Sequence, residues 1–203
     1  MIRPGTVISP YWLEPREMIA RCILSVASQT MPVYHTLVAD GAPQEWFDKY
    51  IGLKHLKLAK HHGDWGNTPR RFAMIADYGS PFIAFLDADN WYDPDHIETC
   101  LAAAKANPGC DFVASRERFV RSCGTPSSAK HEPQDEHIDF NELVLFPSAY
   151  DTAIHALETI PKGNEYHGDR WLYACLKRAG LKPAFTNRET LTYVIANSPK
   201  WTK

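Results

Sequence analysis

The sequence predicts an α/β fold, with a mixed, mainly parallel β-sheet flanked by helices. Strand-like and helix-like segments alternate through the first 115 residues, a pattern typical of right-handed βαβ units. The run from Phe82 to Leu86 is wholly apolar, as expected of a strand covered on both faces. A chain of 203 residues, 44% hydrophobic and 23% charged, suits one such domain.

The elements of the first half follow from apolar periodicity and from the residues that start or stop them. The first helix has apolar residues at helical spacing between Met18 and Val26, begins near Pro15 and ends before Pro32. The fourth begins at Pro94 and is followed by Pro108 and Gly109. The expected strands are 5–10, 33–39, 53–58, 82–87 and 111–115, and the expected helices are 15–29, 44–51, 68–78 and 93–106.

The second half is less regular. The polar segment of about 116–137, which contains Gly124, Pro126 and Pro133, is expected to form either a mobile loop that can act as a lid or a pair of edge strands. Helices are expected over 146–159 and 167–179, and a last strand around 191–195.

Composition excludes several classes of function. A net charge of -2 gives no electrostatic reason to expect binding to nucleic acid. No apolar run approaches the roughly 20 residues that span a bilayer, and the N-terminus does not resemble a secretion signal. The five cysteines are scattered without C-x-x-C spacing, so we expect reduced thiols in a cytoplasmic protein rather than disulfides or a zinc site.

The most informative motif is Asp87-Ala88-Asp89, which follows the apolar run directly. In an extended chain, residues two apart share a face, so both carboxylates can point at one site. Two adjacent anions need a positive partner, and a divalent cation that carries a diphosphate meets that need. The alternative is a surface turn that contains two Asp residues.

Two other strand ends carry chemistry, the segment Pro10-Tyr11-Trp12 and the turn Asp40-Gly41. Ligands of parallel sheets bind at the carboxyl ends of the strands. We therefore expect these residues and the Asp87–Asp89 motif to converge on one cleft.

In order along the chain, several segments resemble glycosyltransferase family 2, the inverting nucleotide-sugar enzymes of the GT-A fold. Each motif is weak alone, but the ordered set covers about residues 5–180. The matching segments are 7–12 (first strand and its exit), 25–30 ("S-v-x-x-Q-t"), 38–41 ("D-G-s"), 69–73 ("a-R-N-x-G"), 85–90 with Pro94 ("f-L-D-x-D-D…P") and 168–172 ("E-D"). The sequence departs from the family pattern at Leu13, Ala39, Arg71 and Gly168.

The resemblance implies a single GT-A domain over 1–203, with a nucleotide-binding half at 1–115 and an acceptor-binding half at 116–203. It implies metal-dependent transfer of a sugar, with inversion, from a UDP-sugar to a glycan or lipid-linked glycan acceptor. Peripheral association with a membrane is left open.

The resemblance also assigns roles to residues. Asp89 would bind Mn²⁺ or Mg²⁺, and Asp87 would bind the ribose, or the metal through water. Asp169 would be the general base, with His167 and Glu165 as rivals. The remaining nucleotide-binding residues would be Asp40 (a hydrogen bond from the base), Arg70 (the diphosphate or Asp87), and Pro10, Tyr11, Trp12 and Ala88 (the walls of the nucleotide site).

Two alternatives remain beside this hypothesis. A sugar nucleotidyltransferase would have a Gly-rich phosphate loop after the first strand, whereas this chain continues Pro10-Tyr11-Trp12. A catalytically inactive glycan-binding module is disfavoured by the intact Asp87–Asp89 motif but remains open because of Gly168.

Overall fold

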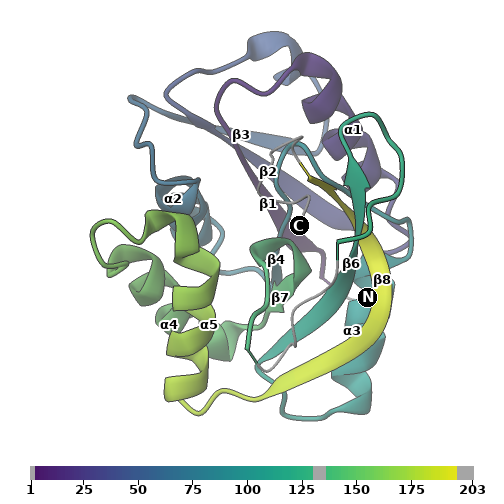
Figure 1. The fold of residues 1–203 in the computed structure, drawn as a ribbon, viewed down its shortest axis with the longest axis vertical. Helices are drawn as coiled ribbons and strands as arrows, with labels where there is room; N and C mark the ends of the chain where they lie inside the picture. The colour runs from purple at the N-terminus through teal and green to yellow at the C-terminus, as the bar shows by residue number, and fades with distance from the viewer. Residues whose placement is uncertain (1–2, 130–135, 196–203) are drawn as a thin grey trace.

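The structure, a computed structural model, describes residues 3–129 and 136–195 (Figure 1). The helices and strands are β1 (Gly5–Tyr11), α1 (Arg16–Ala27), β2 (Val33–Asp40), β3 (Leu53–Leu58), α2 (Asn67–Ala76), β4 (Ile83–Phe85), β5 (Trp91–Tyr92), α3 (His96–Ala106), β6 (Phe112–Arg121), β7 (Leu143–Leu145), α4 (Pro147–Glu158), α5 (Gly168–Arg178) and β8 (Pro183–Ile195). Three 3₁₀ turns complete the set: η1 (Glu45–Phe47), η2 (Phe140–Glu142) and η3 (Glu165–His167).

One sheet joins the eight strands in the order β3-β2-β1-β4-β7-β6-β8-β5. Strands β3, β2, β1 and β4 are mutually parallel, and β6 is parallel to β8. Strand β7 is antiparallel to both of its neighbours, and β5 is antiparallel to β8. The predicted fold class is therefore confirmed.

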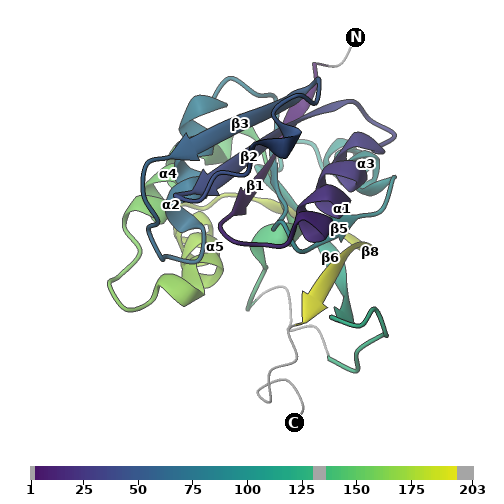
Figure 2. The same cartoon turned by 90° about the horizontal axis from the view of Figure 1, so that it is seen from above.

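Helices cover both faces of the sheet, with α2, α4 and α5 on one face and α1 and α3 on the other (Figures 1 and 2). Side chains alternate between the two layers along each strand, as the pleat requires. In β1, for example, Ile8 packs with Tyr150 and Leu172 on one face, while Val7 packs with Cys22 and Ile97 on the other. Because both layers are apolar, the strands read as nearly continuous hydrophobic runs.

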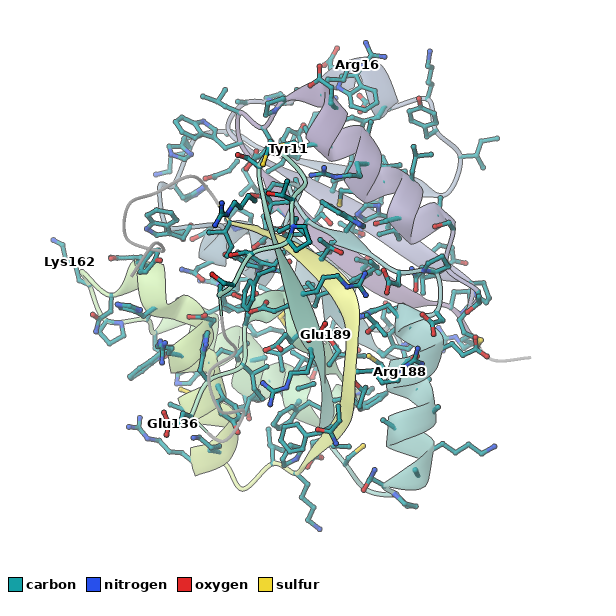
Figure 3. All side chains as sticks on the ribbon, turned by 45° about the vertical axis from the view of Figure 1, so that its right-hand side comes forward. Tyr11, Arg16, Glu136, Lys162, Arg188 and Glu189 are labelled. Atoms are coloured by element: carbon teal, nitrogen blue, oxygen red, sulfur yellow. The ribbon has the colours of Figure 1, made fainter. Side chains whose placement is uncertain are left out.

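The two predicted halves share the sheet. Strand β5 belongs to the first half of the chain but pairs with β8 at its end. Arg188 of β8 donates to Thr99 (2.8 Å) and Asp95 (2.9 Å), so β8 lies beside α3 (Figure 3). Both predicted halves therefore stabilise the side of the sheet formed by β8 and β5.

Several local predictions differ from the structure. The last strand, expected around 191–195, is longer and begins at Pro183 as β8. The loop expected from residue 116 begins later, because β6 continues to Arg121, with Phe119 and Val120 paired to Tyr193 and Val194 of β8. Edge pairing is thus the correct alternative for 116–121, whereas 130–135 lie outside the described residues. The helix expected over 44–51 shortens to η1, where Phe47 is the buried side chain. Strand β7 was not predicted, because three residues are too few for a visible period.

None of the helices in the described part of the chain is long and apolar enough to cross a membrane.

Candidate active site

The carboxyl ends of β1, β2 and β4 lie at the same end of the sheet, which we call the carboxyl edge, because these strands are adjacent and parallel. Strand β1 ends at Tyr11 and β2 at Asp40, while the chain leaves β4 toward Asp87 and Asp89. This edge is where parallel sheets bind ligands. Figure 3 places Tyr11 at the end of its strand on that edge.

Asp87 is held by two neighbours. Arg70 pairs with one carboxylate oxygen, and its guanidinium lies over the ring of Phe140 (4.2 Å). Asn141 donates from Nδ2 to the other oxygen (3.0 Å) and accepts from the Asp87 amide through Oδ1 (2.6 Å). The carboxylate is therefore fixed in direction, and its side chain is still 30% exposed.

The two neighbouring arginines of α2 face different ways. Arg70 is buried and reaches Asp87, whereas Arg71 pairs with Glu158 of α4 (3.3 Å). Successive residues on a helix point in different directions, so only Arg70 of the pair reaches Asp87.

Asp89 lies in a different environment from Asp87. Burial, followed by the charges of Asp87 and Glu14, raises the pKa of its carboxyl group to about 7. Its backbone carbonyl accepts from Arg21 (2.6 Å), whose guanidinium lies on the ring of Trp91 (3.9 Å). A half-buried carboxyl group that is costly to ionise would be stabilised as an anion by a bound cation. The donor chemistry of Asp89 therefore fits a divalent metal better than that of Asp87, which Arg70 already neutralises.

Asp40 is 4% exposed and is surrounded by histidines. Nδ1 of His61 lies 2.8 Å from one carboxylate oxygen, and Nδ1 of His62 lies 2.7 Å from the other. The amide of His62 donates to both oxygens (3.1 and 3.2 Å). A carboxylate accepts about four hydrogen bonds. A nucleotide base that donates to Asp40 must therefore replace one of these contacts.

The Gly41 turn makes this arrangement possible. Its φ of 81° is left-handed, and a Cβ there would overlap the backbone at Lys60 and His61. A glycine at this position lets the loop after β3 approach close enough for both imidazoles to reach Asp40.

The three residues at the end of β1 point to different places. Pro10 lies against Gly66 at the start of α2. Tyr11 is buried, and its hydroxyl lies 2.9 Å from His55, so only its backbone is left for a nucleotide. Trp12 is 44% exposed and stacks on His61 (4.0 Å, 12°). Trp12 and His61 thus form a stacked pair of aromatic rings beside Asp40.

Asp169 lies in the first turn of α5. One carboxylate oxygen lies 2.5 Å from Nε2 of His137, and the other accepts from the amide of Arg170 (2.7 Å). The rival residues are placed differently: the Glu165 carboxylate accepts from Gly163 (3.0 Å), and His167 is exposed. Asp169 is the one of the three that pairs with a half-buried imidazole.

A network of hydrogen bonds runs from Asp87 toward Asp169. Asn141 donates to Asp139 from its amide (2.8 Å) and from Nδ2 (2.6 Å). One ligand atom from each of His137, Asp139 and Asp169 lies within 4.8 Å of the others. These three residues offer a second set of donors that could hold a cation.

Three carboxyl groups in or near this cluster are costly to ionise. Burial, followed by mutual repulsion, raises the pKa of Asp139 to about 6, that of Glu142 to about 8 and that of Glu117 to about 10. Burial lowers the pKa of His137, but its contact with Asp169 raises the pKa by a larger amount, so the net shift is upward. These buried carboxyl groups can therefore accommodate a positive charge next to them.

Five residues of this site were not identified from the sequence: His61, His62, His137, Asp139 and Asn141. One signal was present. Asp139 and Glu142 form a capping box around η2, and D-x-x-E spacing can be read from a sequence. That motif fixes the backbone that presents Asn141 to Asp87.

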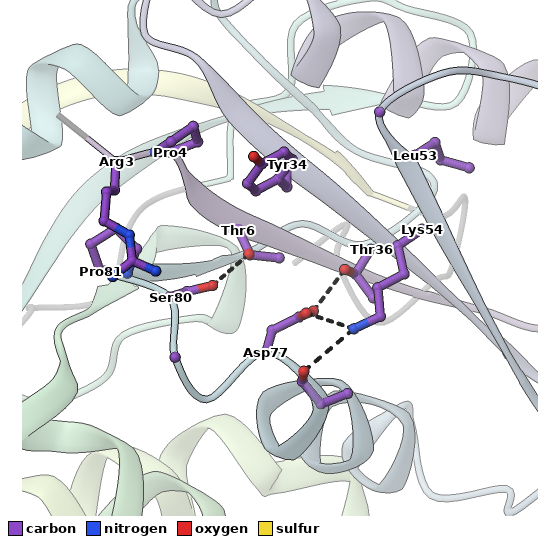
Figure 4. Close-up of a pocket in the computed structure, with 13 residues that line it drawn as sticks. Arg3, Pro4, Thr6, Tyr34, Thr36, Leu53, Lys54, Asp77, Ser80 and Pro81 are labelled. Atoms are coloured by element: carbon purple, nitrogen blue, oxygen red, sulfur yellow. Dashed lines mark hydrogen bonds and ion pairs between the residues drawn. The ribbon is translucent and has the colours of Figure 1, made fainter. Parts of the chain in front are cut away.

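A depression of about 660 Å³ lies elsewhere, at the amino ends of the strands (Figure 4). Asp77 lies in it and accepts from Thr36 (2.7 Å) and Lys54 (2.7 Å). Because these partners already satisfy Asp77, and the depression is at the opposite edge of the sheet, it is not part of the candidate active site.

Comparison with known sequences identifies related proteins. The sequence model described as Glycosyl transferase family 2 matches residues 6–158. Succinoglycan biosynthesis protein ExoW of Rhizobium meliloti (strain 1021) is 29% identical over 99 residues, which cover 45% of this chain and 31% of that protein.

Solved structures share the fold. TarS 1–349 of S. aureus in complex with UDP superposes with a TM-score of 0.71 at 13% identity and covers 95% of this chain. TarS 1–349 in complex with UDP-GlcNAc gives a TM-score of 0.65 at 12% identity and covers 99% of this chain. The match spans 61% of each TarS chain, so this chain corresponds to only part of those proteins.

Proposed function

We propose that this chain, which belongs to glycosyltransferase family 2, is a glycosyltransferase that transfers a sugar from a UDP-sugar to a hydroxyl group of a glycan or lipid-linked glycan, with inversion and with Mn²⁺ or Mg²⁺. The convergence of Asp40, Asp87 and Asp89 at one sheet edge is the observation that carries this proposal. The UDP and UDP-GlcNAc complexes of TarS support the donor class. The succinoglycan protein supports a saccharide acceptor.

The donor would lie across the strand ends. Trp12 and His61 provide a flat surface for the base beside Asp40. Asp87, held by Arg70 and Asn141, accepts hydrogen bonds from the ribose hydroxyls or binds the metal through water. Asp89 and Ala88 complete the site, and Asp89 holds the cation.

Expulsion of the diphosphate is the difficult step. A cation at this site neutralises the charge that grows on the leaving group. Arg70 would contribute by holding the Asp87 carboxylate in a fixed direction at this site.

Asp169 would take the proton of the attacking hydroxyl group. One of its oxygens is oriented by Nε2 of His137, which lies 2.5 Å away. Attack from the face opposite the leaving diphosphate inverts the anomeric carbon.

Among the described residues, all five cysteines are free, which supports our placement of the protein in the cytoplasm.

A panel of nucleotide sugars tests this function through thermal unfolding with and without Mn²⁺. A ligand at about 100 times its Kd stabilises the folded state by about 2.7 kcal/mol. We expect UDP-sugars to raise Tm only when Mn²⁺ is present, and Asp89→Ala to remove that rise. Asp151→Ala, which removes an exposed carboxylate of α4, is the matched control. A metal-independent rise that Asp89→Ala leaves intact contradicts the proposal.

A further inference from the structure

Two exposed aromatic rings from distant parts of the chain meet beside the candidate active site. Trp65 lies in the loop before α2, and Tyr166 lies in η3 just before α5. Their ring centroids are 4.9 Å apart at 77°, yet Trp65 is 67% exposed and Tyr166 is 56% exposed. Large apolar side chains that cluster on the surface indicate a surface for binding rather than for core packing.

The loop of Trp65 is tied to the donor side of the site. Trp65 has a left-handed φ of 59°, which is rare for a bulky residue and needs support from its surroundings. That support comes from Arg70, whose Nη1 donates to the Trp65 carbonyl (2.9 Å). The guanidinium that holds Asp87 therefore also holds the loop that presents Trp65.

Asn67 joins this loop to the loop of Tyr166. Its Nδ2 donates to the carbonyls of Asp64 (2.5 Å) and Glu165 (2.8 Å). The Asn67 side chain lies directly on Gly168, where a Cβ would overlap its amide group. The chain departs from the family pattern at this position, and glycine there allows the two loops to join and Trp65 to contact Tyr166.

We propose that Trp65 and Tyr166 form an acceptor subsite that binds a pyranose unit of a glycan. This inference rests on the proposed function, because it supplies the acceptor for Asp169. Aromatic rings pack against the C–H face of a sugar, and the Tyr166 hydroxyl can bond to its polar edge. Tyr166 precedes Asp169 by three residues, so a sugar bound to these rings lies near the proposed base.

Other occupants fit less well. A stable protein interface buries about 800 Å² on each partner, far more than two rings offer. A membrane surface would require a cluster of basic residues. The loop before η3 has one lysine, Lys162, which points outward, and Glu165 follows it (Figure 3).

Calorimetric titration with two uncharged probes, cellopentaose and chitopentaose, tests the subsite directly. We expect the wild-type protein to bind at least one of them, and Trp65→Ala and Tyr166→Ala each to weaken its Kd by about tenfold. Trp65→Phe and Tyr166→Phe keep a ring and should retain most of the affinity. Tyr34→Ala removes an exposed tyrosine (55%) from the amino end of β2 and should change nothing.

A parallel titration with UDP and Mn²⁺ separates this inference from the proposed function. UDP affinity should be the same in the wild type and in both alanine variants. If UDP does not bind to the wild type, the proposed function fails, whereas the pentasaccharide titration still reports on the subsite. The subsite is overturned if neither probe binds, if the alanine variants bind as well as the wild type, or if they lose UDP affinity in parallel.

Discussion

Asn141 holds Asp87 through two hydrogen bonds, one to its backbone amide (2.6 Å) and one to its carboxylate (3.0 Å). The same side chain donates to Asp139 (2.6 Å), which lies beside His137 and Asp169. A single buried amide group therefore links Asp87 to the cluster that contains the candidate base. Asparagine is suited to this position because it supplies both a donor and an acceptor without charge.

Replacement of Asn141 should disturb donor binding. Asn141→Ala removes the partner of the Asp87 amide and of one Asp87 carboxylate oxygen, at a cost of about 1–3 kcal/mol, while Arg70 still pairs with the other oxygen. Asn141→Asp, although similar in shape, places a third carboxyl group between Asp87 and Asp139 and should weaken UDP binding more at neutral pH. Titration calorimetry with UDP and Mn²⁺ measures both effects. Asn107→Ala, at the exposed end of α3, serves as the control, and equal affinities in all variants would contradict this role.

Asp169→Asn should separate binding from turnover. The amide keeps the shape of the side chain but cannot take up a proton, so kcat should fall by about 10²–10⁴-fold while the UDP Kd stays constant. His137→Ala should also lower kcat, because Asp169 loses the partner that orients it. Donor turnover at saturating UDP-sugar measures both variants. A near wild-type rate in Asp169→Asn would move the base to another residue.

Gly168→Ala should destabilise the protein, because its Cβ would overlap the side chain of Asn67. Such overpacking costs about 1–3 kcal/mol. The cost should shrink when Asn67→Ala is present in the same chain, and urea unfolding of the two single variants and the double variant measures this coupling. Gly79→Ala is the control, since a Cβ there meets no atom within 4 Å. Additive effects of the two single variants would show that the contact is unimportant.

His96 should make the protein sensitive to acid. Burial lowers the pKa of its imidazole to about 3, although Asp93 and Asp95 act in the opposite direction. The unfolded chain takes up this proton near pH 6.5, so the stability that His96 contributes falls as the pH drops from about 6.5 toward 3, by up to about 1.4 kcal/mol per pH unit.

The difference in unfolding free energy between wild type and His96→Phe isolates this effect from that of the buried carboxyl groups. Phenylalanine keeps the stacking on Tyr92 (3.7 Å) but has no group to titrate. We expect the wild type to lose stability relative to His96→Phe in urea unfolding between about pH 7 and pH 4.5. Parallel curves for the two proteins would show that the pKa of His96 is the same in the folded and unfolded states.

The sequence by itself determined the fold class and the placement of the strand-end residues. Apolar runs and helix-capping residues are local signals, and the parallel arrangement follows from their alternation along the chain. This reasoning located Asp40, Asp87 and Asp89 at one sheet edge. It also found the helices around Arg70 and Asp169, although in the first of them Ala73 and Met74 are buried while Phe72 and Ile75 are exposed.

Only the tertiary structure decided which side chains meet. Asn141 and Asp87 are 54 positions apart, and Asn67 and Glu165 are 98 apart, so no local pattern connects them. The short strand β7 and the extension of β6 to Arg121 likewise depend on pairing with distant strands. Contacts of this kind form because the packed sheet brings remote loops to one edge, and their free energy belongs to that packing and not to any single segment.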